Sequence, residues 1–278
     1  MPAFFEPHER MFKPMVPVGS FSQSGRQSIK WIAMSLCLCV LGYVAVTAQR
    51  AHRIHRLISE LDWANDRNPN DREGASEELV KIGASAVKPL IASLRDSRLD
   101  VRPWVLRTLV KIGVPAVGPL ISTMKEEEGK PAVGNIGFLA QNALTEIGAP
   151  AVEPLAAILK DPNGKLRWDT ISTLGRIRDA SATQALIAAT KNPDSRVRMI
   201  AAQQLGQIQD LDAVPSLIAA LQDPDPGVRE SAALALGRIN DSRKIEPLTA
   251  ALNDPEPSVR AEAARALGRM QDPAQTEP

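Results

Sequence analysis

The C-terminal half of the chain alternates short apolar segments with polar turns at a regular period. Four consecutive units end at Asp179, Asp210, Asp241 and Asp272, so that one unit follows another every 31 residues. The second half of a unit, for example residues 197–208, places apolar residues at the i, i+4, i+8 and i+11 spacing of a helix with one buried stripe. A period of this length predicts a solenoid, in which each unit buries its apolar face against its neighbours.

Each unit is predicted to contain two antiparallel helices. The first is short and apolar, and a proline often falls in its first turn, as at Pro89 and Pro154, where the missing N–H would have no helical partner. An Asx-Pro pair such as Asp223-Pro224 then ends this helix and redirects the chain. The apolar stripe described above forms the second helix.

Glycines recur inside the second helices, at Gly175, Gly206, Gly237 and Gly268. A glycine in a helix interior costs about 1 kcal/mol relative to alanine. Four of them in register therefore indicate a structural requirement, and we expect the helix of the next unit to approach closely at these positions.

A long apolar segment precedes the repeats. Residues 31–48 contain no charge, and as a helix these 18 residues would extend about 27 Å, close to the hydrocarbon thickness of a bilayer. Lys30 and Trp31 flank one end, and Arg50 and Arg53 the other, as is typical of a span anchored at both interfaces. We therefore expect a single-pass membrane protein with a signal anchor.

This prediction divides the chain into four regions: a disordered tail (1–30), a transmembrane helix (31–48), a repeat solenoid (50–272) and a C-terminal tail (273–278). A cleaved signal peptide is the alternative, because Val46-Thr47-Ala48 has the small residues of a processing site. The basic residues on the two sides of the span are nearly balanced, so the sequence predicts no side for the repeat domain.

The repeats carry a recurrent series of short motifs: Pro-Leu-x-x-Leu, Asp-Pro, Val-Arg, Ala-Ala and Leu-Gly. This series resembles HEAT repeats, particularly the short class named after phycobilisome (bilin) lyases, over roughly residues 50–272. The resemblance implies an all-α, right-handed α-solenoid of about seven helix-hairpin units, preceded here by the one transmembrane helix. It also implies a protein that holds partners.

An Asp in the turn and an Arg six residues later recur in most units. The pairs are Asp96/Arg102, Asp161/Arg167, Asp223/Arg229 and Asp254/Arg260, with Asn192/Arg198 as a variant. Either an anion-binding row or a ladder of ion pairs between neighbouring units, as HEAT-like repeats use, would produce this pattern. The strict periodicity favours the structural ladder. A single exposed pair contributes only about 0–1 kcal/mol, so the ladder matters as a network.

The second helices also place a column of side chains outside the buried stripe, on the side expected to be concave in this family. One row of the column contains Phe138, Trp168 and Met199, and another contains Arg176, Arg238 and Arg269. Apolar side chains rimmed by arginine predict a partner-binding surface. The alternative is that Phe138 and Trp168 pack under the long loop at residues 126–135.

Charge and residue usage narrow the class of function. The chain has 33 basic and 32 acidic residues, for a net charge of +1, and this balance does not indicate a nucleic-acid binder. The histidines are His8, His52 and His55, and the cysteines Cys37 and Cys39 lie in the apolar segment. The His-Glu pairs with which HEAT-like deoxyhypusine hydroxylases hold iron are missing, so we expect no metal site and no cofactor.

The sequence therefore predicts a membrane-anchored, non-catalytic scaffold or adaptor that binds a partner protein. The alternative, suggested by the repeat family's name, is a bilin-lyase-like or chaperone-like activity on a bound prosthetic group.

Overall fold

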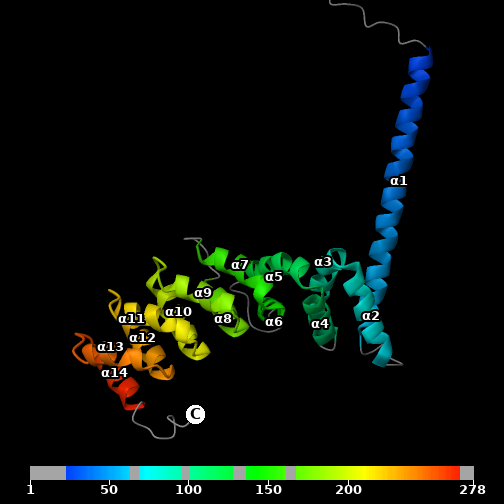
Figure 1. Ribbon diagram of the computed structural model, residues 1–278. Coiled ribbons are helices and arrows are strands. Elements are labelled where there is room, and N and C mark those ends of the chain that lie inside the picture. Colours follow the sequence, from blue (N-terminus) through cyan, green and yellow to red (C-terminus); the bar gives the residue numbers. More distant parts are fainter. Residues whose placement is uncertain (1–22, 63–68, 96–100, 128–135, 161–166, 270–278) are drawn as a thin grey trace, which may run out of the picture. The chain divides into compact units, whose positions relative to one another are not determined.

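The computed structural model describes residues 23–62, 69–95, 101–127, 136–160 and 167–269 (Figure 1). These residues form helices joined by turns and contain no strand. The chain divides into two units between Arg53 and Ile54.

The first unit contains most of a single long helix, α1 (Gln23–Glu60). Its residues from Met34 to Glu60 form one helix that is long and apolar enough to cross a membrane, as a span or as a signal sequence. Large apolar side chains in this part, such as Leu38 and Leu41, are more than 60% exposed. The helix extends beyond the predicted span of residues 31–48 at both ends, and it includes residues 23–30 of the predicted tail.

The second unit is a stack of helical hairpins in two layers. The first helices of the hairpins form the A layer: α3 (Ala84–Ser93), α5 (Val114–Glu127), α7 (Ala149–Leu159), α9 (Ala180–Ala189), α11 (Val214–Ala220) and α13 (Ile245–Ala251). The second helices form the B layer: α2 (Pro69–Ile82), α4 (Arg102–Ile112), α6 (Ile136–Ile147), α8 (Arg167–Ile177), α10 (Ser195–Ile208), α12 (Pro226–Arg238) and α14 (Pro257–Arg269). Short 3-10 turns, η3 (Leu211–Ala213) and η4 (Ser242–Lys244), precede α11 and α13.

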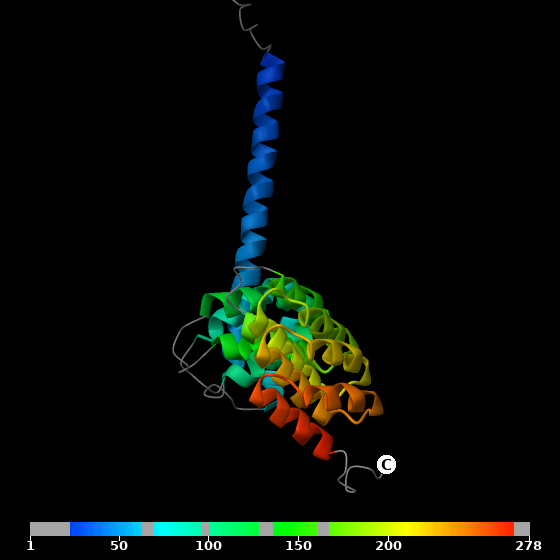
Figure 2. The same cartoon turned by 90° about the vertical axis from the view of Figure 1, so that its left-hand side faces the viewer.

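Contacts follow this two-layer order. Each B helix contacts the next B helix, and each hairpin packs its A helix against its own B helix. In Figure 1 helices α3, α5, α7 and α9 lie above α4, α6, α8 and α10, and Figure 2 views the row from the end that holds α13 and α14. The all-α repeat fold expected from the 31-residue period is thus confirmed.

One continuous core runs between the layers. Every A helix buries a leucine completely, and five of the six units bury an alanine four residues before it: Ala86, Ala116, Ala151, Ala182 and Ala213. Ile54, Leu57 and Leu61, at the end of α1 and just beyond it, are also buried in this core. The core therefore extends to the residues that precede the first hairpin.

The helical glycines allow close packing between B helices. A Cβ added at Gly206 would lie 2.6 Å from Ala235 Cα, and one added at Gly237 would lie 2.8 Å from Ala266 Cβ. The close approach expected from the sequence is therefore confirmed at these two positions. At Gly175 an added Cβ would meet only the flexible side chain of Gln204, and at Gly268 it would meet nothing within 4 Å.

The B helices begin slightly earlier than their apolar stripe indicates. Helix α10 begins at Ser195 and α12 at Pro226, two residues before the first buried valine. The carboxylates of Asp194 and Asp225 accept hydrogen bonds from the free N–H groups of the first turns, which is why the helices start there.

Candidate partner-binding surface

The exposed and half-buried side chains of the B helices form a continuous surface, which we call the B face. We define it on the six B helices from α4 to α14, each of which contributes three positions spaced four residues apart. Row 1 contains Pro103, Phe138, Trp168, Met199, Glu230 and Ala261; row 2 contains Arg107, Asn142, Ser172, Gln203, Leu234 and Arg265; row 3 contains Lys111, Glu146, Arg176, Gln207, Arg238 and Arg269.

Row 1 carries the apolar residues singled out in the sequence. Phe138 lies on α6 and is 51% exposed, and Trp168 lies on α8 and is 42% exposed. Met199 on α10 is half-buried and packs against the core. Because α6 contacts α8 and α8 contacts α10, the structure places these three side chains on successive neighbouring helices. Residues 128–135 of the predicted long loop lie outside the described residues.

An arginine lies over each of the two aromatic rings. The guanidinium carbon of Arg176 lies 6.0 Å from the centre of the Phe138 ring, and Arg176 Nη2 donates to Asn142 Oδ1 at 2.7 Å. The guanidinium carbon of Arg196 lies 5.8 Å from the centre of the Trp168 ring. Each ring is thus held beside a cation from the next helix while its other surface stays exposed.

Row 3 lies at the C-terminal ends of the B helices, where cations interact favourably with the helix dipole. Lys111 Nζ lies 3.4 Å from Glu73 Oε1, and Arg269 Nη2 lies 3.8 Å from Glu262 Oε1. Arg176 and Arg238 are exposed. The structure thus brings the predicted arginines onto one face, in two different electrostatic settings.

The Asp and Arg residues of the turns form contacts between neighbouring units. Arg198 donates from Nε and Nη2 to the two carboxylate oxygens of Asp223, both at 2.7 Å. Its Nη1 donates to the backbone carbonyl of Asn192 in its own turn at 2.9 Å. Arg229 and Asp254 repeat the arrangement at 2.8 and 2.9 Å. The side chains in both pairs are only 9–13% exposed, so solvent screens them weakly.

The other predicted ladder residues have different surroundings. Arg260 donates to the backbone carbonyl of Asp254 at 2.7 Å, and Arg102 donates to that of Leu94 at 3.2 Å. Asn192 replaces the carboxylate with an amide, and its Nδ2 donates to the carbonyl of Leu159 at 2.8 Å. Asp96, Asp161 and the side chain of Arg167 lie outside the described residues.

Ionisation of the ladder follows from these contacts. Hydrogen bonds from Arg229, followed by the backbone N–H of Glu256, hold the pKa of Asp254 below its usual range against the opposing effect of burial. Burial acts most strongly on Asp223 and would raise its pKa, but Arg198 and the backbone N–H of Asp225 together hold that pKa below its usual value. Both carboxylates are therefore ionised at neutral pH.

Two contributors to the B face were not recognised from the sequence. Asn142 fixes Arg176, and Arg196 lies over Trp168 although it precedes the apolar stripe of α10. Trp168 and Arg196 are 28 residues apart, three less than the repeat period. Met199 is the residue of the next unit that is equivalent to Trp168, and Arg196 lies three residues, or about one helical turn, before it. This offset is the signal in the sequence that indicates the contact.

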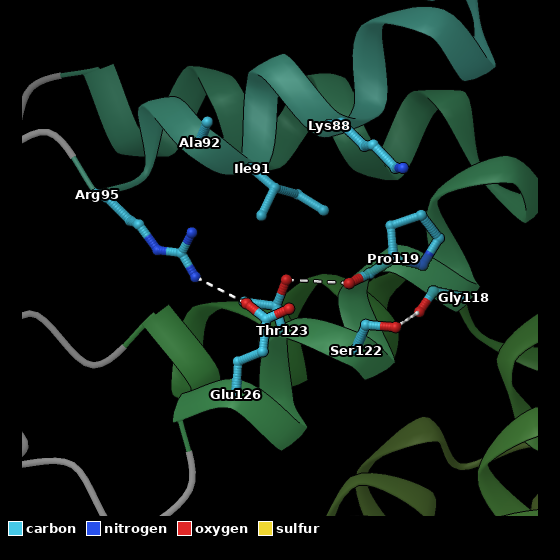
Figure 3. A pocket seen from close by; sticks show the side chains of 9 residues that line it. All are labelled: Lys88, Ile91, Ala92, Arg95, Gly118, Pro119, Ser122, Thr123 and Glu126. Carbon is cyan, nitrogen blue, oxygen red and sulfur yellow. Dashed lines mark hydrogen bonds and ion pairs between the residues drawn. The ribbon is translucent and has the colours of Figure 1, made fainter.

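A separate groove of about 610 Å³ lies in the A layer between α3 and α5 (Figure 3). Arg95 Nη2 crosses it to Glu126 Oε2 at 3.0 Å, and the hydroxyls of Ser122 and Thr123 donate to backbone carbonyls of their own helix. These polar groups therefore serve the fold. Among the described residues, no group of three His, Cys, Asp or Glu side chains is arranged to hold a metal ion.

Residues 152–223 and 214–278 match a family model described as HEAT repeats. The resemblance to HEAT repeats drawn from the sequence is thereby confirmed. No curated protein sequence matches the chain.

Several solved structures are similar in fold. Human deoxyhypusine hydroxylase in complex with glycerol is 23% identical, covering 81% of this chain and 97% of that chain, with a TM-score of 0.40. The complex of CpcE and CpcF of phycocyanin lyase from a Nostoc species is 22% identical, covering 79% and 88%, with a TM-score of 0.32. A designed armadillo repeat protein in complex with a peptide is 15% identical, covering 77% and 98%, with a TM-score of 0.37.

Proposed function

We propose that the chain is a membrane-anchored scaffold that binds a partner protein on the B face and carries out no chemistry itself. The observation behind this proposal is the exposure of Phe138 and Trp168 on neighbouring helices, each beside an arginine. Exposed aromatic side chains flanked by arginine are enriched at the centres of protein interfaces.

Burial of these rings by a partner would supply binding energy. Aromatic side chains bury large apolar areas, and each Å² of apolar surface removed from water contributes about 25 cal/mol. The arginines beside the rings are held in place before binding, Arg176 by Asn142 and Phe138. Such pre-organisation reduces the entropy lost when a partner docks.

The ladder has a structural role in this proposal. Arg198 and Arg229 each tie the turn of their own unit to the carboxylate of the next, as Arg198 does with Asn192 and Asp223. This fixes the spacing of the B helices and hence of the side chains that they present. The proposed binding surface depends on that spacing.

The anchor is the second part of the proposal. The apolar helix from Met34 to Glu60 supports a membrane span. A span should remain in the membrane pellet after alkaline carbonate extraction and keep residues 1–48 by mass spectrometry. A product that begins at Gln49 would instead identify a cleaved signal peptide. Reporters fused after Pro278 would give the side of the repeats.

Site-specific photo-crosslinking tests the scaffold function. A benzophenone amino acid would replace Trp168 or Phe138 in the full-length chain within its own membrane, and Gln184, exposed on the A layer, would provide the control position. We expect a discrete protein adduct from the two B-face positions and none from position 184. Equal adducts from all three positions, or none from the B face, would rule out the proposed surface. A chromophore that co-purifies with the protein would support the lyase-like alternative.

A further inference from the structure

We propose that the B face selects an acidic, extended segment of its partner, with carboxylates that pair with Arg176 and Arg238 and an apolar side chain that packs on Trp168. This inference rests on the proposed function and specifies the chemistry of the partner. It follows from which cations of the B face form ion pairs with carboxylates of the chain and which do not.

Row 3 holds most of the positive charge of the B face. Four of its six residues are cations, Lys111, Arg176, Arg238 and Arg269, and one, Glu146, is an anion. Row 2 adds the cations Arg107 and Arg265, and row 1 adds the anion Glu230. The three rows together therefore contain six cations and two anions. The chain as a whole has a net charge of only +1. Positive charge is thus concentrated on this face.

The cations at the two ends of the B face are already paired. Arg107 and Lys111 both approach Glu73 Oε1 at 3.4 Å. Arg265 Nη1 lies 2.7 Å from Glu262 Oε2, and Arg269 lies near the other oxygen. These end cations have less to gain from a partner carboxylate.

The two central arginines differ from the end cations and from the ladder arginines. Among the described residues, no carboxylate lies within ion-pair distance of Arg176 or Arg238. Arg176 is instead held by a neutral amide and a ring, which orient the guanidinium without neutralising it. An oriented guanidinium that lacks an anion is suited to a two-point bond with a carboxylate.

The spacing of these arginines indicates an extended ligand. Helix α10 separates α8, which carries Arg176, from α12, which carries Arg238. Packed helices lie about 8–10 Å apart, so two steps correspond to about 16–20 Å. An extended chain advances about 3.3 Å per residue and would cover this interval in roughly five or six residues. Gln207, on α10 between the two arginines, offers a neutral polar side chain along the way.

Trp168 supplies the apolar contact on the same helix as Arg176. The two residues are eight positions apart on α8, which is about two helical turns, or about 12 Å along the axis. A segment that first follows α8 for roughly four extended residues and then crosses to α12 can therefore reach the ring and both guanidinium groups. Glu146 lies on α6, beside this zone, and Glu230 lies in row 1 of α12, eight residues before Arg238. Both would repel acidic segments placed on those parts of the face.

Peptide binding to the full-length chain in detergent tests the inference. The probe is a fluorescein-labelled synthetic peptide with one tryptophan and a run of glutamates, compared with the same peptide carrying glutamine at every glutamate. We expect the acidic peptide to bind more tightly than the glutamine peptide, and we expect its binding to weaken when salt is added. The variant Arg176→Glu/Arg238→Glu should bind it roughly tenfold more weakly or worse.

Two controls separate binding from folding. Lys88→Glu/Lys191→Glu makes the same change in net charge at two exposed positions outside the three rows, one on α3 and one in the turn after α9, and should weaken binding less than about threefold. Arg176→Gln/Arg238→Gln removes the charges without reversing them and should give an intermediate loss. Circular dichroism must show that each variant keeps its helix content. Equal binding of both peptides, no binding of either, or equal losses in the two charge-reversed variants would overturn the inference.

The same variants in the crosslinking experiment distinguish this inference from the proposed function. If position 168 forms its adduct and Arg176→Glu/Arg238→Glu leaves the yield unchanged, the scaffold function stands and the acidic partner is excluded. If position 168 forms no adduct in the wild-type background, the proposed function itself fails.

Discussion

Arg229 of one repeat forms a two-point ion pair with Asp254 of the next repeat, with Nε–Oδ2 and Nη2–Oδ1 distances of 2.8 and 2.9 Å. The same guanidinium donates from Nη1 to the backbone carbonyl of Asp223 in its own repeat at 2.8 Å. One side chain therefore connects two turns, and its loss should affect both repeats.

Asp254→Asn should lower the free energy of unfolding by about 1–3 kcal/mol, because it leaves the Arg229 guanidinium mostly buried without its anion. Glu78→Gln, in an exposed pair with Lys81, is the matched control and should cost less than about 0.5 kcal/mol. Urea denaturation followed by circular dichroism would measure both. A cost no larger for Asp254→Asn than for the control would mean that the ladder contributes little to stability.

The ladder should also make the solenoid sensitive to acid. The pKa values of Asp223 and Asp254 are lowered in the folded chain, so the unfolded chain binds more protons as the pH falls. Their contribution is fully present above the ordinary pKa of about 3.9 and is lost as the pH falls through the lowered values. Between about pH 5 and 2, the stability of wild type should therefore fall more steeply than that of Asp254→Asn. Parallel pH profiles would contradict this.

Lys244 should make the stability of the folded chain depend on pH in the alkaline range. Its side chain is only 3% exposed and occupies the position where five other units bury an alanine. Its Nζ donates a hydrogen bond to the backbone carbonyl of Ile239. Burial lowers the pKa of this amine. The unfolded chain therefore binds more protons between that lowered pKa and about 10.4, and stability should rise with pH across this interval.

Lys244→Met keeps the aliphatic stem and removes the charge. It should raise the free energy of unfolding at neutral pH by on the order of 1 kcal/mol and remove the alkaline rise. Thermal melts at neutral and alkaline pH would show both effects. A variant that retains the alkaline rise would show that another group causes it.

Two glycines offer a matched test of helix packing. Gly206→Ala places a Cβ 2.6 Å from Ala235 Cα and should destabilise the chain by about 1–3 kcal/mol, because backbone must move. Gly268→Ala makes the same chemical change where nothing lies within 4 Å, and it should stabilise by about 0.5–1 kcal/mol through helix propensity. The sign of the difference is the result to measure. Two changes of equal sign would argue against a packing role for Gly206.

Trp168→Ala should leave the fold intact, because the ring is 42% exposed. We expect a loss of no more than about 1 kcal/mol from stability, while the crosslinked adduct formed from Phe138 falls strongly. Leu174→Ala, on the same helix but with a fully buried side chain, should cost about 2–5 kcal/mol. If Trp168→Ala unfolds the chain as Leu174→Ala does, the ring belongs to the core.

The sequence predicted the repeat architecture well because one period controls many positions at once. The recurring leucines and the turn residues place the A and B helices, and the interval from Asp223 to Asp254 equals one unit. The first residues of the B helices were harder to predict, because Asp194 and Asp225 cap their helices through single side chains outside the apolar stripe.

The surface contacts were harder to predict than the core. The position of Arg196 over Trp168 depends on side-chain reach across two helices, which no periodic pattern encodes. The burial of Lys244 was not predicted for a different reason. This lysine occupies a position where other units bury an alanine, and only the structure shows that its amine donates to a backbone carbonyl.

The turns that join one hairpin to the next use two different chemistries along the chain. Gly83, Gly113 and Gly148 make the early junctions with backbone φ angles of 69°, 72° and 76°, a region that favours glycine. Later junctions use Asp179, Asp210 and Asp241, whose carboxylates accept hydrogen bonds from the next helix.

Glycine junctions have no proton to gain, whereas the pKa values of Asp179 and Asp241 are held below their usual range by hydrogen bonds from Ser181 and Arg243. Acidification should therefore loosen the solenoid directionally, from its C-terminal repeats towards the glycine-joined repeats, and not as a single block. At a pH well below the ordinary aspartate value of about 3.9, the last repeats would then unfold while the first repeats remain folded.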